Sequence, residues 1–293
     1  MVASAGTGAR VPAALPRILK DYTKAAIRTQ PKDLLTWSVA YFRSMTNGSV
    51  PPSRIGSSSR FLNRRAASHP ESCACFTVSS MVASAGTGAR VPAALPRILK
   101  DYTKAAIRTQ PKDLLTWSVA YFRSMTNGSV PPVKDRLEFP VPESKGGISP
   151  GILRVLHRQL GSEGSIEWGA LQEVCEAMGV EETMAQEAWK RAGGGDKGAV
   201  EWDHVLTHIA GLATHSDAEA LQLVMATISE DPVGHKVPAD TIVDHLHRLH
   251  THSNIVPTDQ YNDTVGYLND IANYQDGFLA PSDLTRPSCP LVN

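Results

Sequence analysis

The residues of this sequence best suited to coordinate a metal lie close together near its C-terminal end. Asp244, His245, His247, His250 and His252 carry carboxylate and imidazole side chains, which are ligands of zinc. On a helix, His245 and His252 share one face and His247 and His250 lie on another, so the imidazoles do not converge as tetrahedral ligands must. We therefore expect a solvated helix face here and no metal site.

The remaining reactive residues form neither a catalytic nor a disulfide pattern. The four cysteines, Cys73, Cys75, Cys175 and Cys289, are scattered, which argues against a disulfide framework and favours a reducing compartment. The sequence contains no phosphate-binding loop, no G-x-S-x-G, no H-E-x-x-H and no kinase signature. We expect a non-catalytic protein that uses no cofactor.

The charge balance also restricts the partners. Lys and Arg together number 29, as do Asp and Glu, so no net field attracts nucleic acid or an anionic membrane. No apolar run approaches the length of about 18 residues that spans a bilayer. We expect a cytoplasmic protein that binds neither nucleic acid nor membrane.

The chain contains an unbroken internal repeat, because residues 1–52 are identical to residues 81–132 at all 52 positions. Exposed positions tolerate substitution, so the copy is either very recent or an artefact of how the reading frame was assembled. Its second start at Met81 favours the artefact or a duplicated first exon. The intervening residues 53–80 are rich in Ser, Arg and small residues, which is typical of a disordered linker or of translated non-coding sequence. A second linker is expected at 133–148.

Each copy predicts a helical hairpin. Apolar residues recur with helical spacing in the first half of the first copy, at Leu15, Ile18, Leu19, Tyr22, Ala26 and Ile27. Pro31 then ends this helix and suits the first turn of a second helix, which closes at Asn47-Gly48. A hairpin of this size buries too little apolar surface to be stable alone. Two hairpins packed as a four-helix bundle resolve this.

The order of residues within the hairpin resembles a known family. Val11-Pro12, the run Arg28-x-Gln30-Pro31-x-Asp33-Leu34 and the pair Tyr41-Phe42 are similar to the RIIa domain, the dimerisation and docking domain of type II regulatory subunits of protein kinase A. The resemblance covers about 36 residues per copy, with cores at 11–46 and 91–126. The run from Tyr22 to Pro31 is closer still to ropporin and to the RIIa-bearing radial spoke proteins of cilia and flagella.

That resemblance implies a fold, a site and partners. It implies an X-type antiparallel four-helix bundle whose first helices form a groove for the amphipathic helix of an A-kinase-anchoring-type radial spoke scaffold. Carried over by position, the groove would use Val11, Leu15, Leu19, Thr23 and Ile27 with Val91, Leu95, Leu99, Thr103 and Ile107. The dimer core would use Leu34, Tyr41, Phe42, Leu114, Tyr121 and Phe122. Its implied location is the axoneme of a cilium or flagellum, and the alternative is a cytosolic anchoring adaptor of the cyclic-AMP pathway.

The hairpin can find its partner in the same chain or in another. About 50 residues connect Met45 to Leu95, and a flexible connection of that length spans roughly 35 to 40 Å. We therefore expect the two copies to pair within one chain as a monomeric pseudo-dimer. A product beginning at Met81 would instead form a homodimer or pair with another RIIa protein.

Residues 149–284 predict a second helical domain, followed by a tail at 285–293. The segments Gly164-Ser165-Ile166-Glu167-Trp168 and Gly198-Ala199-Val200-Glu201-Trp202 share one pattern, and Gly277-Phe278-Leu279 echoes it. A Gly at position six and an apolar residue at position eight resemble EF-hand loops, which implies paired helix-loop-helix units. Most calcium ligands are missing from these loops, since only the last has an acid at position twelve, Asp283, together with Asp276 at position five. A calcium sensor is thus the least favoured alternative.

Overall fold

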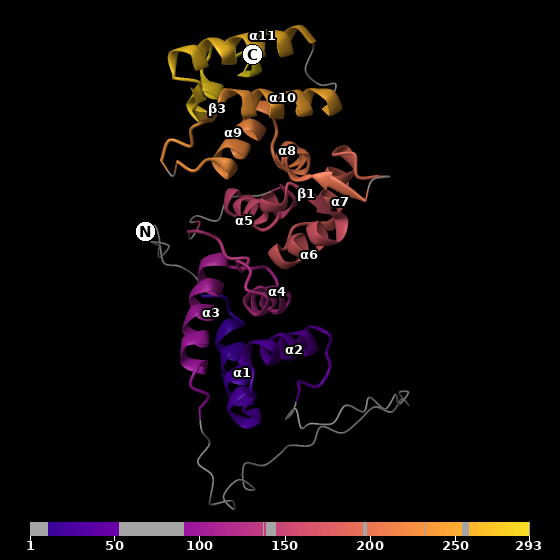
Figure 1. Cartoon of the computed structure of the whole chain (residues 1–293), viewed down its shortest axis with the longest axis vertical. Coiled ribbons are helices and arrows are strands. Elements are labelled where there is room, and N and C mark those ends of the chain that lie inside the picture. Colours follow the sequence, from indigo (N-terminus) through magenta and orange to yellow (C-terminus); the bar gives the residue numbers. More distant parts are fainter. Residues whose placement is uncertain are drawn as a thin grey trace, which may run out of the picture.

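The computed structural model of the chain describes residues 11–52, 91–136, 138, 145–195, 198–231, 233–253 and 258–292. Figure 1 shows the two hairpins at one end of the molecule and the C-terminal helices at the other. The described part is helical with short strands, as predicted. The predicted linker at 53–80 lies outside the described residues. Among the described helices, none is long and apolar enough to span a bilayer.

The two identical copies fold into equivalent hairpins. The first consists of α1 (Leu15–Thr29) and α2 (Leu34–Thr46), and the second of α3 (Leu95–Thr109) and α4 (Leu114–Asn127). Gln30 ends α1 in the left-handed conformation. Asp33 then caps α2, because its carboxylate accepts hydrogen bonds from the amides of Leu35 at 3.0 Å and Thr36 at 3.2 Å. Hydrogen bonds from Thr36 lower the pKa of Asp33.

The hairpins pair mainly through α2 and α4, and aromatic rings form the centre of this contact. Phe42 stacks on Phe122 with ring centroids 5.3 Å apart and an interplanar angle of 11°. Tyr22 lies 5.8 Å from Phe122, and Tyr102 lies 5.8 Å from Phe42, so the contacts are reciprocal. Reciprocal contacts between identical segments are those that a two-fold axis produces. The predicted four-helix bundle is confirmed, and the two copies pair within one chain.

The tyrosine hydroxyls inside this aromatic core are satisfied within each hairpin. The hydroxyl of Tyr22 lies 2.6 Å from Ser38 Oγ, and that of Tyr102 lies 2.7 Å from Ser118 Oγ. Each serine donates onward to a helix carbonyl, that of Leu34 or Leu114. Burial raises the pKa of Tyr22 to about 12. The six residues predicted for the dimer core, Leu34, Tyr41, Phe42, Leu114, Tyr121 and Phe122, are all buried.

The C-terminal domain consists of two pairs of helix-loop-helix units. The short turns η2 (Lys145–Gly147) and η3 (Gly161–Glu163) flank its first helix. The first pair comprises α5 (Pro150–Leu160), β1 (Ser165–Glu167), α6 (Trp168–Met178), α7 (Glu182–Arg191), β2 (Ala199–Glu201) and α8 (Trp202–Ala213). The second comprises α9 (Asp217–Ile228), β3 (Val237–Pro238), α10 (Ala239–Ser253), α11 (Thr258–Tyr274), β4 (Phe278–Leu279) and η4 (Pro281–Thr285). In each pair the loops join as a short antiparallel ladder, with Ile166 opposite Val200 and Val237 opposite Leu279.

The register of these ladders identifies a loop that the sequence pattern did not reveal. Val237 takes the place of the apolar residue at position eight in the loop between α9 and α10. Counting back, position six is His235, which adopts a positive φ of 49° where the other loops have Gly. The glycine on which the sequence pattern depends is therefore absent from this loop. The structure thus completes the two pairs that the resemblance predicted.

Two segments expected to be a linker and a tail pack against the domains. Lys134, in the predicted linker 133–148, is buried, and its ammonium group donates to Glu138 at 2.6 Å. Burial would raise the pKa of Glu138, but hydrogen bonds from Lys134 and Ser149 outweigh it and lower the pKa. In the predicted tail 285–293, Cys289 is buried and precedes η5 (Pro290–Val292), whose Pro290 carbonyl accepts from Gln260 at 2.6 Å.

The histidine-rich helix α10 corrects one expectation, because His245 is buried and does not lie on a solvated face. Its Nδ1 lies 2.6 Å from Thr207 Oγ1, and that hydroxyl donates to the Asp203 carbonyl at 2.6 Å. His247 is exposed, and His250 stacks on Tyr261 with centroids 4.6 Å apart. The side chain of His252 is outside the described set, and the described residues contain no cluster of three potential metal ligands.

We expect the buried His245 to make stability depend on pH. Burial lowers its pKa to about 4, whereas an unfolded histidine titrates near pH 6.5. Between these values the unfolded chain binds more protons, so stability falls as the pH drops from about 6.5 towards 4, by on the order of 3 kcal/mol. Urea unfolding across this range should show the slope, and His245→Gln should remove this part of it. An identical slope in the variant would contradict the assignment.

Candidate docking groove

An open groove of about 600 Å³ runs between α1 and α3 at the end of the molecule farthest from α11. Each helix contributes the same four positions, which are Leu19, Lys20, Thr23 and Lys24 from α1 and Leu99, Lys100, Thr103 and Lys104 from α3. The groove is therefore two-fold symmetric, like the aromatic core beneath it. The two helices that form its walls have identical sequences.

The helical repeat divides these positions into an apolar floor and a basic rim. On α1, Leu15, Tyr22 and Ala26 face the core. Leu19 and Thr23 lie beside that buried face, and Lys20 and Lys24 lie a further 100° or so around the helix, towards solvent. In α3, Thr103 donates to the Leu99 carbonyl at 2.6 Å, so its hydroxyl is satisfied and its methyl group can contact a ligand. The groove offers an apolar strip bordered by ammonium groups.

The structure separates the ten predicted groove residues into four groups, one of which is the buried pair Leu15 and Leu95. Leu19, Thr23, Leu99 and Thr103 line the groove. Val11 and Val91 precede the helices and are 52% and 51% exposed. Ile27 and Ile107 are half-buried and pack against the core without lining the groove.

Leu15 and Leu95 were predicted for the groove, but this prediction is wrong for the present conformation. Both side chains are only 1% exposed and belong to the bundle core. They share the apolar stripe with Leu19, but they occupy the part of it that is buried in the core. The lysines were not predicted as site residues, although each follows a predicted one by a single position, which is the signal that identifies them.

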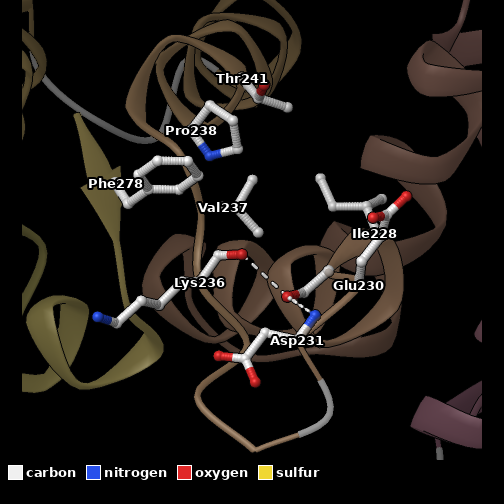
Figure 2. Close-up of a pocket in the computed structure, with 9 residues that line it drawn as sticks. Ile228, Glu230, Asp231, Lys236, Val237, Pro238, Thr241 and Phe278 are labelled. Carbon is white, nitrogen blue, oxygen red and sulfur yellow. Dashed lines mark hydrogen bonds between the residues drawn. The ribbon is translucent and has the colours of Figure 1, made fainter. Parts of the chain in front are cut away.

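A second hollow lies in the C-terminal domain, beside the β3–β4 ladder, and has a volume of about 630 Å³ (Figure 2). Ile228, Val237 and Phe278 give it an apolar wall. Its polar atoms bond locally, since Ser229 Oγ donates to the Lys236 carbonyl at 2.9 Å and accepts from the Asp231 amide at 3.1 Å. Its lining combines apolar contact with local hydrogen bonds.

The two sequence-identical hairpins differ in what covers them. Helix α6 packs on α4, where Arg123 pairs with Glu173. Thr116, Ala120 and Arg123 are consequently half-buried, whereas their counterparts Thr36, Ala40 and Arg43 on α2 are exposed. The chain after α4 is held by α5, because Arg158 donates to the Val133 carbonyl at 2.6 Å and Gln159 donates to that of Val130. The second copy therefore joins the groove to the C-terminal domain.

The buried tryptophans of the two hairpins also differ in their hydrogen bonds. Trp117 Nε1 donates to the Pro132 carbonyl at 2.8 Å. The identical Trp37 has the same burial, but its Nε1 has no hydrogen-bond partner in the described structure. An unpaired buried donor costs free energy, whereas a paired one contributes about 1 kcal/mol.

We expect Trp117→Phe to destabilise the bundle by about 1 to 3 kcal/mol more than Trp37→Phe. Both changes remove the same volume from the same sequence context, so each variant is the matched control of the other. Only Trp117→Phe removes a hydrogen bond, and Trp37→Phe also removes an unsatisfied donor. Urea unfolding of both variants measures the difference, and equal losses of stability would refute it.

Comparison with known protein families agrees with this geometry. The model of the ropporin N-terminal domain family matches residues 7–49 and 86–129, which contain the two helical hairpins. Each matched segment holds one helix that lines the groove, α1 or α3, and one that carries a ring of the central Phe42–Phe122 stack, α2 or α4. Each hairpin thus matches the ropporin N-terminal domain, the match occurs twice in the chain, and it is consistent with the predicted RIIa-type domain of the ropporin group.

Proposed function

We propose that this protein is a non-catalytic docking component of the ciliary or flagellar axoneme, and specifically of the radial spoke. Its paired ropporin-type domains hold the amphipathic helix of an A-kinase-anchoring-type scaffold in the groove between α1 and α3. The observation that carries the proposal is the open apolar strip, to which each copy contributes the same leucine, Leu19 from α1 and Leu99 from α3. Helix-in-groove recognition requires such a strip, with contacts spaced about one turn apart.

The rest of the molecule fits a connector. The bundle contacts the C-terminal helical domain through α4 and α6 and the Arg123–Glu173 ion pair. A ligand helix bound on the α1–α3 side leaves that contact undisturbed, because α6 packs on α4. The C-terminal domain can therefore hold a second component while the groove is occupied.

Two measurements test the proposal. A peptide helix with apolar residues at i, i+4 and i+8 should bind the full chain and cross-link to Lys20 or Lys100. In fractionated ciliated cells, the native protein should stay with detergent-extracted axonemes and co-purify with spoke components. Complete recovery in the soluble fraction, together with cyclic-AMP anchoring proteins, would replace the axonemal role with that of a cytosolic adaptor.

A further inference from the structure

The groove carries more charge than an apolar docking site needs. Its rim has four ammonium groups, those of Lys20, Lys24, Lys100 and Lys104. The ion pairs of the described α1 and α3 join Arg17 to Asp21 and Arg97 to Asp101, and they leave the four lysines without a carboxylate partner. Within each helix, four basic residues stand against one acidic residue. The described rim is therefore a concentrated positive field around an apolar floor.

The spacing of these lysines limits what can lie between them. Lys20 and Lys24 are four residues apart, so their stems rise about 6 Å apart along α1. A ligand helix with acidic residues at i and i+4 on one edge matches that spacing. The same argument applies to Lys100 and Lys104 on the other wall. The apolar stripe of the ligand must lie between the two acidic edges in order to cover Leu19 and Leu99.

We infer that the occupant of this groove is an amphipathic helix whose apolar stripe is bordered by acidic residues on both edges. This inference rests on the proposed function and specifies the chemistry of the partner. A helix with neutral or basic edges would cover the same floor and leave four like charges unneutralised beside it. Because the two walls are equivalent by two-fold symmetry, such a helix finds complementary charges in either direction along the groove.

Peptides of two kinds, tested on the full chain, distinguish this inference from the proposed function. One peptide is an apolar-striped helix with Glu on both edges, and the other has the same sequence with Gln in place of each Glu. At low salt we expect the Glu peptide to bind roughly tenfold or more tightly than the Gln peptide. The advantage should shrink as added salt screens the charges. Equal affinities at low salt would overturn the inference while leaving the groove in place.

A charge-matched pair of variants locates the effect. Lys20→Gln, Lys24→Gln, Lys100→Gln and Lys104→Gln together should abolish the preference for Glu and keep binding of the Gln peptide. The control, Arg28→Gln, Lys32→Gln, Arg108→Gln and Lys112→Gln, removes the same charge from the same two copies at positions that do not line the groove. It should retain the preference. A preference that survives loss of the four rim lysines would refute their role, and binding of neither peptide would refute the proposed function as well.

Discussion

Replacing both Phe42 and Phe122 with alanine is expected to separate the two hairpins. Each ring is fully buried, and the two stack on each other at the centre of the α2–α4 contact. Truncating a buried Phe costs about 3 to 5 kcal/mol through lost burial and the cavity left behind. Two such losses approach the whole stability of a small domain, about 5 to 15 kcal/mol. Since neither hairpin is stable alone, the bundle should unfold.

Hydrogen exchange at the amides of α2 and α4 measures this outcome directly. We expect protection there to disappear in the double variant, while the amides of α8 and α9 in the C-terminal domain keep theirs. Val50→Ala is the control, because Val50 is highly exposed and its truncation should change stability by less than about 0.5 kcal/mol. Retained protection of α2 and α4 in the double variant would show that the aromatic stack does not hold the pair together.

Replacing Leu19 and Leu99 with alanine is expected to weaken binding of the ligand helix strongly. They are the two large apolar residues of the groove lining, one from each wall. Loss of a buried apolar anchor costs roughly 1 to 3 kcal/mol, so the double variant should lose about 30-fold or more in affinity. The two side chains lie at the surface of the bundle, so the fold should persist.

Titration calorimetry with an amphipathic anchoring peptide measures this loss. Leu35→Ala is a suitable control, because this leucine is half-buried on α2 and does not line the groove. Ile107→Ala is a second comparison, since the resemblance places it in the groove and the structure packs it against the core. Undiminished affinity of the Leu19/Leu99 variant would contradict the groove assignment.

Local signals in the sequence predicted the helices and the paired domains well. Proline positions and the glycine-based loops act over a few residues, and they marked the break between the helices and the ladders correctly. The start of the second helix was wrong, because α2 begins at Leu34 with Asp33 as its cap and Pro31 lies before the helix. Helical periodicity predicted the apolar stripe of α1 correctly. It could not divide that stripe between core and groove, because the burial of Leu15 and the accessibility of Leu19 depend on how the two hairpins pack together.

The features that the sequence did not reveal depend on tertiary contacts. The sequence around Lys134 and Glu138 predicted a polar linker. In the structure their side chains lie mostly buried beside Ser149 and form a hydrogen-bonded ion pair. His245 lies among polar neighbours in sequence, and only the packing of α10 on α8 encloses it. The loop at His235 lacks the expected glycine, and only its ladder with β4 identifies it. Trp37 and Trp117 have identical neighbours in sequence but different hydrogen-bonding environments. Identical sequences therefore need not have the same tertiary contacts.

The central claim is that the two copies pair within one chain and so form one helix-binding groove. Sedimentation of the full chain at nanomolar concentration with a labelled amphipathic peptide tests it most directly. We predict one complex that contains a single chain of 31.6 kDa and a single peptide. Complexes that contain two chains, or a chain that sediments without peptide at saturating peptide concentration, would contradict the account.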